Sequence, residues 1–257
     1  IGTAQLGLNY GTLKRRKKIS IKEFQKIIKY CERKKILSID TAINYGNSEI
    51  KIGKVLSNFK SSFDITTKIP SLGKIKSKNI SKKITDLVKL SSSKLNSNIN
   101  TILLHDLNDL KSKRKFIIYD SLINLKKNKI VKNIGFSAYN FEDVRSVLKD
   151  FKFDIIQVPF NVFDQRLLSK NLLKFLKKNK IKIHIRSIFL QGILIDYNEK
   201  YSLVRKNFEA FNKWKKFLKF NKLTELEACI AFVKKYKFYS KVLIGFDNFN
   251  QLYKIIF

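Results

Sequence analysis

The sequence contains no methionine, only two prolines and only nine glycines among its 257 residues. With so few prolines and glycines, no flexible linker divides the chain, and a chain of this length can bury a large core. We therefore expect one domain over residues 1–257. The chain lacks methionine and begins inside the apolar segment IGTAQLG, and it stops at LYKIIF within a predicted helix. We expect the domain to be truncated at both ends.

Cysteine is equally scarce. Cys31 and Cys229 lie far apart and have no metal-ligand spacing around them, which excludes a disulfide framework and gives no support to a metal site. Neither has a partner that would make it a nucleophile. No apolar run reaches the roughly 18 to 20 residues of a membrane span, and no leader-like segment opens the chain. We predict a cytoplasmic protein without a membrane partner.

Acidic residues are few: 20 Asp and Glu stand against 54 Lys and Arg, for a net charge of +34. A basic groove would suggest nucleic acid, because neutralised phosphates release counterions. The lysines are instead spread over the polar faces of helical patterns, and the densest run, KRRKK at 14–18, is short. We interpret the charge as a solvated surface and expect no nucleic-acid partner, with a nucleic-acid groove as the alternative. The charge favours acidic ligands such as phosphates.

Short apolar runs rich in β-branched residues alternate with segments of helical periodicity, for example residues 21–31. Nearly continuous apolar strands between helices indicate a parallel sheet covered by helices. Eight such units in about 250 residues predict an α/β fold, a (β/α)8 TIM barrel. A doubly wound open sheet is the alternative, although its GxGxxG fingerprint is absent. The eight runs are GTAQLGL, ILSIDTA, FDITTKI, TILLHD, KNIGFSA, DIIQVPF, KIHIRSIF and KVLIGF.

Ionisable residues stand at the ends of three consecutive predicted strands. Asp40 ends the second strand and Tyr45 follows on its loop, while Lys68 and His105 end the next two. The carboxyl ends of barrel strands form the active-site mouth. Each residue alone has an ordinary structural explanation: Asp40 as a helix cap, Tyr45 as an aromatic residue at the rim, Lys68 as a surface lysine and His105 as a core histidine. Together they point to a site, because a buried lysine and aspartate need each other.

These four residues have a specific joint chemistry. A lysine ammonium beside the phenol is expected to lower the pKa of Tyr45, while the carboxylate of Asp40 keeps Lys68 charged and oriented. The tyrosine then becomes a usable general acid. His105 can hydrogen-bond the carbonyl oxygen of a substrate. Such a site polarises and protonates a carbonyl group, but it lacks a hydride donor, which no side chain supplies.

Eight short motifs resemble the aldo-keto reductase family, in its bacterial branch, over essentially the whole chain. The resemblance implies a (β/α)8 barrel, a nicotinamide cofactor that is usually NADPH, and the catalytic tetrad Asp40, Tyr45, Lys68 and His105. The substrate would be a small carbonyl compound, and one branch of the family suggests a sugar-derived one. The motifs are GTAQLG, DTAINYGNSE, TTK, LLHD, GFSAYN, QVPFN, RSIFLQG and LIGFDN.

The resemblance also implies a set of cofactor-binding residues. Ser137 and Gln157 match residues that hold the nicotinamide carboxamide, although Ala138 replaces the asparagine that often follows the serine. Arg186 stands where a ring commonly stacks on the nicotinamide. Gln251 replaces an arginine that often pairs with the 2′-phosphate, and Asp247 would repel a phosphate, so NADP is expected with NAD as the alternative. The implied set is Gly2, Thr3, Asp40, Ser137, Gln157, Arg186, Ser187, Gly245, Asn248 and Gln251.

Three functions follow as hypotheses. The first is an NAD(P)H-dependent carbonyl reductase in which Tyr45 donates the proton. The second is a catalytically silent cofactor-binding sensing subunit on the same barrel, and the third is nucleic-acid binding. Two other features have structural interpretations: we expect His184 to pack in the barrel wall, and the amphipathic helix around Trp214 to cover the site.

Overall fold

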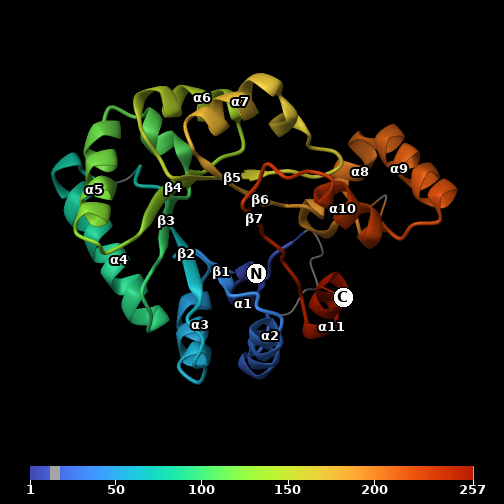
Figure 1. Ribbon diagram of the computed structural model, residues 1–257, viewed down its shortest axis with the longest axis horizontal. Coiled ribbons are helices and arrows are strands. Elements are labelled where there is room, and N and C mark those ends of the chain that lie inside the picture. The colour runs from blue at the N-terminus through green and yellow to red at the C-terminus, as the bar shows by residue number, and fades with distance from the viewer. Residues whose placement is uncertain (12–17, 74, 199, 257) are drawn as a thin grey trace.

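A computed structural model describes residues 1–11, 18–73, 75–198 and 200–256. Helices surround a curved parallel sheet (Figure 1). The basic run at 14–18 lies outside the described residues except for Lys18. No helix of the described chain is long and apolar enough to cross a lipid bilayer.

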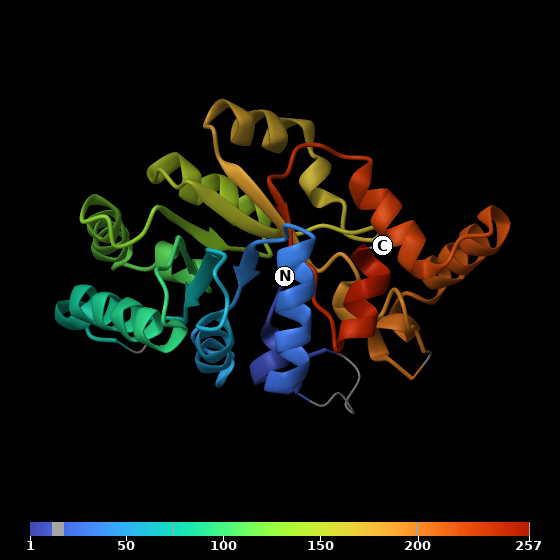
Figure 2. The same ribbon diagram turned by 60° about the horizontal axis from the view of Figure 1, so that its bottom comes forward.

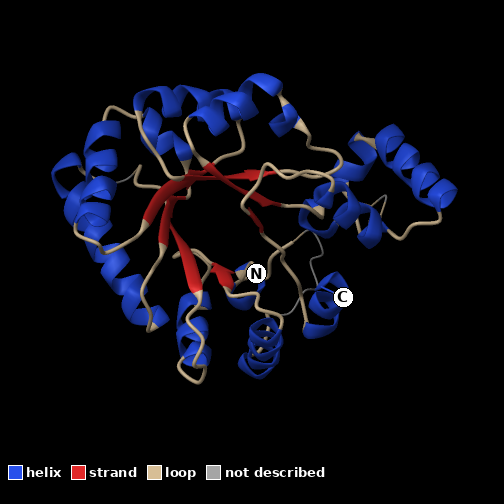
Figure 3. Ribbon diagram, in the orientation of Figure 1, coloured by secondary structure: helices blue, strands red, loops and turns tan. Residues whose placement is uncertain are grey.

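The described residues form one sheet of seven parallel strands in chain order, β1 to β7. The strands curve around a common axis with the helices outside them (Figure 3). Each strand lies within one of the predicted runs, which confirms the α/β barrel class. The strands are β1 (Ser38–Asp40), β2 (Asp64–Ile69), β3 (Thr101–Leu104), β4 (Asn133–Ser137), β5 (Ile155–Pro159), β6 (Lys182–Arg186) and β7 (Lys241–Val242).

The helices fill the segments of predicted helical periodicity. Several α-helices begin at a side-chain cap: Thr224 and Glu227 form a reciprocal capping box at the start of α10, Ser20 accepts from the Glu23 N–H at the start of α2, and Asn140 accepts from the Glu142 N–H at the start of α6. The helices are α1 (Ala4–Gly7), α2 (Ile21–Arg33), α3 (Ser48–Leu56), α4 (Ile80–Leu95), α5 (Lys115–Lys127), α6 (Phe141–Asp150), α7 (Lys170–Lys178), α8 (Ser202–Lys206), α9 (Phe208–Asn221), α10 (Glu225–Lys234) and α11 (Phe249–Ile256), with short 3-10 turns η1 (Ser77–Asn79), η2 (Leu107–Lys111), η3 (Arg166–Leu168) and η4 (Leu190–Gly192).

The first predicted strand, GTAQLGL, is wrong for most of its length. Only Gly2 pairs, through an isolated parallel bridge to Asp40, and the chain then turns at Thr3 into the buried helix α1. A short apolar run is compatible with a buried helical turn as well as with a strand, so its sequence pattern does not distinguish the two structures. Gly2 nevertheless takes the position of an eighth strand, because its N–H also donates to the Ile244 carbonyl at 2.8 Å.

Two glycines allow α1 to lie against the loop that carries Tyr45. A Cβ built on Gly7 would lie 1.6 Å from the Tyr45 carbonyl oxygen, a distance that no side chain can occupy. Gly46 has a φ of +56°, and a Cβ there would lie 2.8 Å from the Gly7 carbonyl oxygen. Because glycine has no Cβ, the backbones at Gly7 and Gly46 can approach each other this closely. This contact holds the Tyr45 loop against the end of the barrel.

Candidate active site

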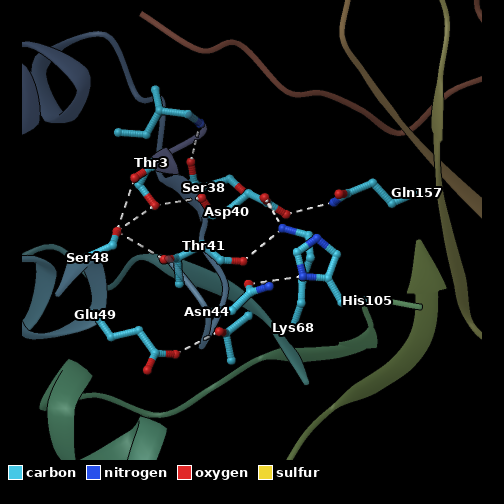
Figure 4. A network of polar contacts seen from close by, with 12 residues as sticks. Thr3, Ser38, Asp40, Thr41, Asn44, Ser48, Glu49, Lys68, His105 and Gln157 are labelled. Carbon is cyan, nitrogen blue, oxygen red and sulfur yellow. Dashed lines mark hydrogen bonds and ion pairs between the residues drawn. The ribbon is translucent and has the colours of Figure 1, made fainter. Parts of the chain in front are cut away.

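The four predicted catalytic residues come from three neighbouring strands and one loop. Asp40 ends β1, Lys68 lies one residue before the end of β2, and His105 directly follows β3. Tyr45 lies on the loop between β1 and α3. Figure 4 shows Asp40, Lys68 and His105 directed toward one another. Parallel pairing of β1, β2 and β3 produces this arrangement, because it aligns the carboxyl ends of the three strands.

Lys68 and Asp40 form a buried ion pair. The side chain of Lys68 is 2% exposed, and its ammonium donates to Asp40 Oδ1 and, at 2.8 Å, to the Thr41 carbonyl oxygen. Gln157 Nε2 donates to the other carboxylate oxygen of Asp40 at 2.7 Å. Burial lowers the pKa of Lys68, while the charge and hydrogen bond of Asp40 oppose that shift. The carboxylate thus favours the charged amine inside the barrel, as the sequence predicted.

Tyr45 lies against both cationic and aromatic neighbours. Lys68 Nζ lies 5.4 Å from the centroid of its ring, and the rings of Tyr45 and His105 meet edge to face at 5.9 Å. Burial, followed by the Asp40 carboxylate, raises the pKa of Tyr45, and Arg186 acts in the opposite direction. The predicted lowering of this pKa by Lys68 is therefore wrong for this structure, because desolvation of the phenolate dominates. The phenol stays protonated at neutral pH.

His105 is a neutral ring in this site. Burial, and next the charge of Lys68, lower the pKa of His105 to about 4. Its Nδ1 lies 3.1 Å from Asn44 Oδ1. A neutral imidazole carries one proton, so the orientation of the Asn44 amide and the tautomer of the ring decide together whether Nε2 donates or accepts. Donation to a substrate oxygen requires the proton on Nε2, with the Asn44 amide nitrogen facing Nδ1.

A second group of polar side chains holds this centre from behind (Figure 4). Ser48 Oγ donates within a buried cluster to Thr3 at 3.1 Å and accepts from Thr41 Oγ1 at 3.2 Å. The buried Glu49 carboxylate accepts from Thr67 at 2.7 Å and from Ser91 at 3.2 Å. Sequence reasoning did not assign Asn44, Thr41, Ser48 or Glu49, although all four lie within the stretch DTAINYGNSE that identified Asp40 and Tyr45.

A cavity of about 700 Å³ opens beside the tetrad and extends to α11. Asp40 and Tyr45 line it, whereas Lys68 and His105 do not. Of the residues implied for a cofactor, all but Ser137 line it; they are Gly2, Thr3, Asp40, Gln157, Arg186, Ser187, Gly245, Asn248 and Gln251. Lining residues that sequence reasoning missed include Gln5, Tyr10, Phe189, Gln191, Asp196 and Lys254.

A sequence profile of the Aldo/keto reductase family matches residues 1–257. The chain belongs to this family. Its general activity is therefore that of an oxidoreductase acting on carbonyl groups. The comparison with curated protein sequences gave no match.

Solved aldo-keto reductases share the fold. The holo form of aldo-keto reductase AKR11C1 from Bacillus halodurans superposes with a TM-score of 0.74 at 16% identity, covering 100% of this chain and 84% of that one. The glycerol dehydrogenase AKR11B4 from Gluconobacter oxydans gives a TM-score of 0.73 at 18% identity, with the same coverage of 100% and 84%. At these identities the likeness concerns the barrel itself.

Within this aldo/keto reductase, Ser137 and Gln157 are register partners on β4 and β5. Ser137 is buried at the end of its strand, while Gln157 reaches the cavity and Asp40. Gln157 thus lines the cavity, whereas Ser137 is not among the lining residues.

At the far end of the cavity, Asp247, Asn248 and Gln251 form a local network. The Asp247 N–H donates to Gln251 Oε1 at 2.8 Å, and Gln251 Nε2 donates to Asp247 Oδ2 at 3.2 Å. Asn248 Oδ1 accepts from the Gln251 N–H at 2.9 Å, inside the first turn of α11. The carboxylate of Asp247 and the amide of Gln251 therefore lie where the family resemblance implied an arginine.

The remaining predicted features have simpler environments. His184 is 2% exposed within β6, and burial lowers its pKa to about 4, as expected of a residue in the barrel wall. Burial raises the pKa of Cys31 to about 11 and that of Cys229 to about 12, so neither thiol ionises near neutral pH. Among the described residues, no group of three His, Cys, Asp or Glu side chains could hold a metal ion.

The helix α9 does not cover the site as predicted. None of its residues lines the cavity, and it extends from the edge of the barrel (Figure 1). Trp214 packs against Phe163 at 6.4 Å and stacks on Phe217 at 5.9 Å. Phe211, Trp214 and Leu218 are buried at this edge of the molecule, whereas Phe208, Phe217 and Phe220 are exposed.

Proposed function

We propose that this aldo/keto reductase reduces an aldehyde or ketone, sugar-derived ones included, to the alcohol with NAD(P)H, and that Tyr45 donates the proton. The single observation that carries the proposal is the buried Lys68–Asp40 pair beside Tyr45, at the wall of a cavity of about 700 Å³. A buried ion pair is costly to maintain, and it has a clear use beside a phenol that must release a proton.

The lining of the cavity fits a nicotinamide dinucleotide. Side-chain amides, four hydroxyl groups and two cations line one continuous space, and these groups suit the amide, hydroxyl and phosphate groups of such a molecule. Gly245 leaves room that a side chain would fill, since a Cβ there would lie 3.1 Å from Gln5 Nε2. We propose that the cofactor is held by Gly2, Thr3, Asp40, Ser137, Gln157, Arg186, Ser187, Gly245, Asn248 and Gln251.

Each tetrad residue then has a stated task. When bound, the reduced cofactor supplies the hydride that adds to the carbonyl carbon. Tyr45 holds the proton at its Oη and donates it to the carbonyl oxygen, which yields the alcohol. Lys68 stabilises the phenolate that remains, and Asp40 keeps Lys68 charged and directed. His105, neutral near pH 7, orients the carbonyl oxygen through Nε2–H when the Asn44 amide nitrogen, rather than Oδ1, faces Nδ1.

We propose NADP as the usual cofactor, with NAD as an accepted alternative. Lys254, on the same helix α11 as Gln251, lines the cavity and supplies a cation for the 2′-phosphate that distinguishes NADP from NAD. Asp247 and Gln251 weaken that preference. We also propose a cytoplasmic location, which two free, buried cysteines support.

The first test is turnover by wild type and the Tyr45→Phe variant. We expect NADPH-dependent reduction of small aldehydes, ketones or sugar aldehydes, and a loss of at least about 100-fold in kcat in Tyr45→Phe, because general acids typically contribute this much. The measurement is absorbance of the reduced nicotinamide, with cofactor binding followed separately by fluorescence. Retained activity in Tyr45→Phe would exclude Tyr45 as the acid. Cofactor binding by wild type without any turnover would favour the silent sensing subunit.

A further inference from the structure

Arg186 ends β6 and lines the cavity together with Tyr45 and Gln157. The side chain is half-buried, and its guanidinium lies over the ring of Tyr139 at 3.9 Å from the centroid. Two hydrogen bonds hold it there: Nη2 donates to the Ala138 carbonyl oxygen at 3.2 Å and Nη1 donates to Ser187 Oγ at 3.3 Å. The guanidinium is therefore fixed before any ligand arrives, which reduces the entropy cost of binding.

The guanidinium has no anionic partner in the part of the chain that the structure describes. Three carboxylates line the same cavity, Asp40, Asp196 and Asp247, and none of them forms an ion pair with it. Asp40 is engaged by Lys68 and Gln157 instead. A guanidinium carries five N–H donors, and the two bonds to Ala138 and Ser187 leave the others free. A half-buried cation with free donors in a cavity wall is suited to an anion.

Neighbouring groups support the same conclusion. Tyr10 lines the cavity too, and burial, followed by the Tyr45 and Tyr139 phenols, raises its pKa, so its O–H remains a neutral donor. Arg186 opposes this shift, and both side chains line the same cavity. Stacking occupies the face of a guanidinium and leaves the in-plane N–H donors available. A stacking role beside a nicotinamide and an anion-binding role are thus compatible.

We propose that Arg186, assisted by Tyr10, binds an anionic oxygen group, a carboxylate or a phosphate, on the carbonyl substrate itself. This inference rests on the proposed reductase function and narrows its substrates to acidic carbonyl compounds. The fixed guanidinium orients the substrate through its anionic group, and the carbonyl is thereby placed against Tyr45. A planar fork suits a carboxylate or phosphate in two parallel hydrogen bonds.

The test compares 4-formylbenzoate with its neutral isostere 4-formylbenzamide. In the wild type we expect kcat/KM to favour the carboxylate by roughly 10- to 100-fold, the range of a charge-assisted hydrogen bond. In Arg186→Gln this ratio should approach one, and in Arg186→Lys it should recover in part, because the charge returns without the fork. Tyr10→Phe should lower the ratio by a smaller factor. A ratio that is near one in wild type, or unchanged in Arg186→Gln, overturns the proposal.

The matched control is Arg145→Gln, which removes the same charge from the exposed face of α6, away from the cavity. It should keep the wild-type ratio. A ratio lost equally in Arg145→Gln would mean that general charge attraction, and not Arg186, selects the substrate.

A binding experiment separates this proposal from the proposed function. Calorimetry with benzoate and benzamide should show tighter binding of benzoate by wild type and no difference in Arg186→Gln. If this result is obtained without turnover of any carbonyl compound, the anion site stands and the reductase function fails. If turnover occurs but benzoate and benzamide bind alike, the function stands and the anion site fails. Weaker binding of inorganic pyrophosphate in Arg186→Gln, with the benzoate preference intact, would mean that the charge of Arg186 serves only the cofactor, which overturns its role in binding the substrate.

Discussion

At the scale of single residues, burial controls the ionisation of the site. Asp40 and Lys68 are both buried, and each is stabilised as an ion by the other. For Tyr45 and His105, burial outweighs the opposing charges of Arg186 and Asp40, and both side chains are neutral near pH 7. The site thus combines one fixed ion pair with a neutral proton donor and a neutral hydrogen-bonding ring.

The sequence was sufficient to predict which four side chains meet, because strand ends are readable from apolar runs. It was insufficient to predict the pKa of Tyr45. Its direction depends on how far the phenol is removed from water, and on the fact that Lys68 faces Asp40 and the Thr41 carbonyl oxygen. The burial of the phenol and the contacts of Lys68 depend on the three-dimensional packing of the folded chain. The spacing of residues along the sequence does not determine them.

Buried neutral histidine makes stability depend on pH. The pKa of His184 is lowered to about 4 from an ordinary value of 6.5, so the unfolded chain takes up a proton at a higher pH than the folded chain. Stability should therefore fall as pH drops from about 7 to about 5, with His184 accounting for about 2 kcal/mol of the loss. Urea unfolding at both pH values measures it. In His184→Gln the loss should be smaller by that amount, and an identical loss would contradict the assignment.

At the scale of elements, most of the fold followed from the alternation of apolar runs and helical periodicity, and the failures have physical causes. The run GTAQLGL contains too few residues for periodicity to separate a strand from a buried turn, and it forms α1. The helix α9 has an apolar face, but its sequence does not state what that face contacts. For GTAQLGL and for α9, the sequence indicated which residues are apolar, but it did not indicate what those residues pack against.

The contact between α1 and the Tyr45 loop gives a prediction at this scale. In Gly7→Ala the new Cβ would lie 1.6 Å from the Tyr45 carbonyl oxygen, so one of the two backbones must move. We expect a loss of about 2 to 4 kcal/mol in unfolding free energy and a loss of activity, as for other overpacked sites. Chemical denaturation and the NADPH assay measure the two effects.

Gly73→Ala is the matched control for that substitution. A Cβ there would lie 3.6 Å from Ser71 Oγ, an ordinary van der Waals contact. This variant should keep wild-type stability within about 0.5 kcal/mol. Equal stability of the Gly7 and Gly73 variants would show that the close approach of α1 and the Tyr45 loop is dispensable.

At the scale of the whole molecule, the charge and the site have separate explanations. The net charge of +34 is carried mostly by lysines on the outer helices, whereas three carboxylates and two cations line the cavity. The paired carboxylates at the surface, such as Asp154 with Lys126 and Asp150 with Lys115, are exposed enough to contribute little to stability. The composition therefore describes the surface and says little about the chemistry inside the barrel.

The N-terminal residues and the segment that follows β7 lie side by side in the wall of the barrel (Figure 2). The Gly2 N–H donates to the Ile244 carbonyl oxygen, and the Asp40 N–H donates to the Ile1 carbonyl oxygen. We call this junction between residues 1–3 and 244–245 the seam. Thr3 and Gly245, one from each side of the seam, line the cavity. Closing so long a loop carries its entropy cost before the contacts form, which favours late closure in folding.

Folding of the barrel and assembly of the cavity are then a single kinetic event. Pulsed hydrogen exchange during refolding should show the amides of Gly2 and Asp40 gaining protection together, after those of β3 to β5. Early protection of either amide would indicate that the seam forms first. A nascent chain would accordingly remain without a ligand site until residues around Ile244 have left the ribosome, and its exposed strand edges would be the surface on which chaperones act.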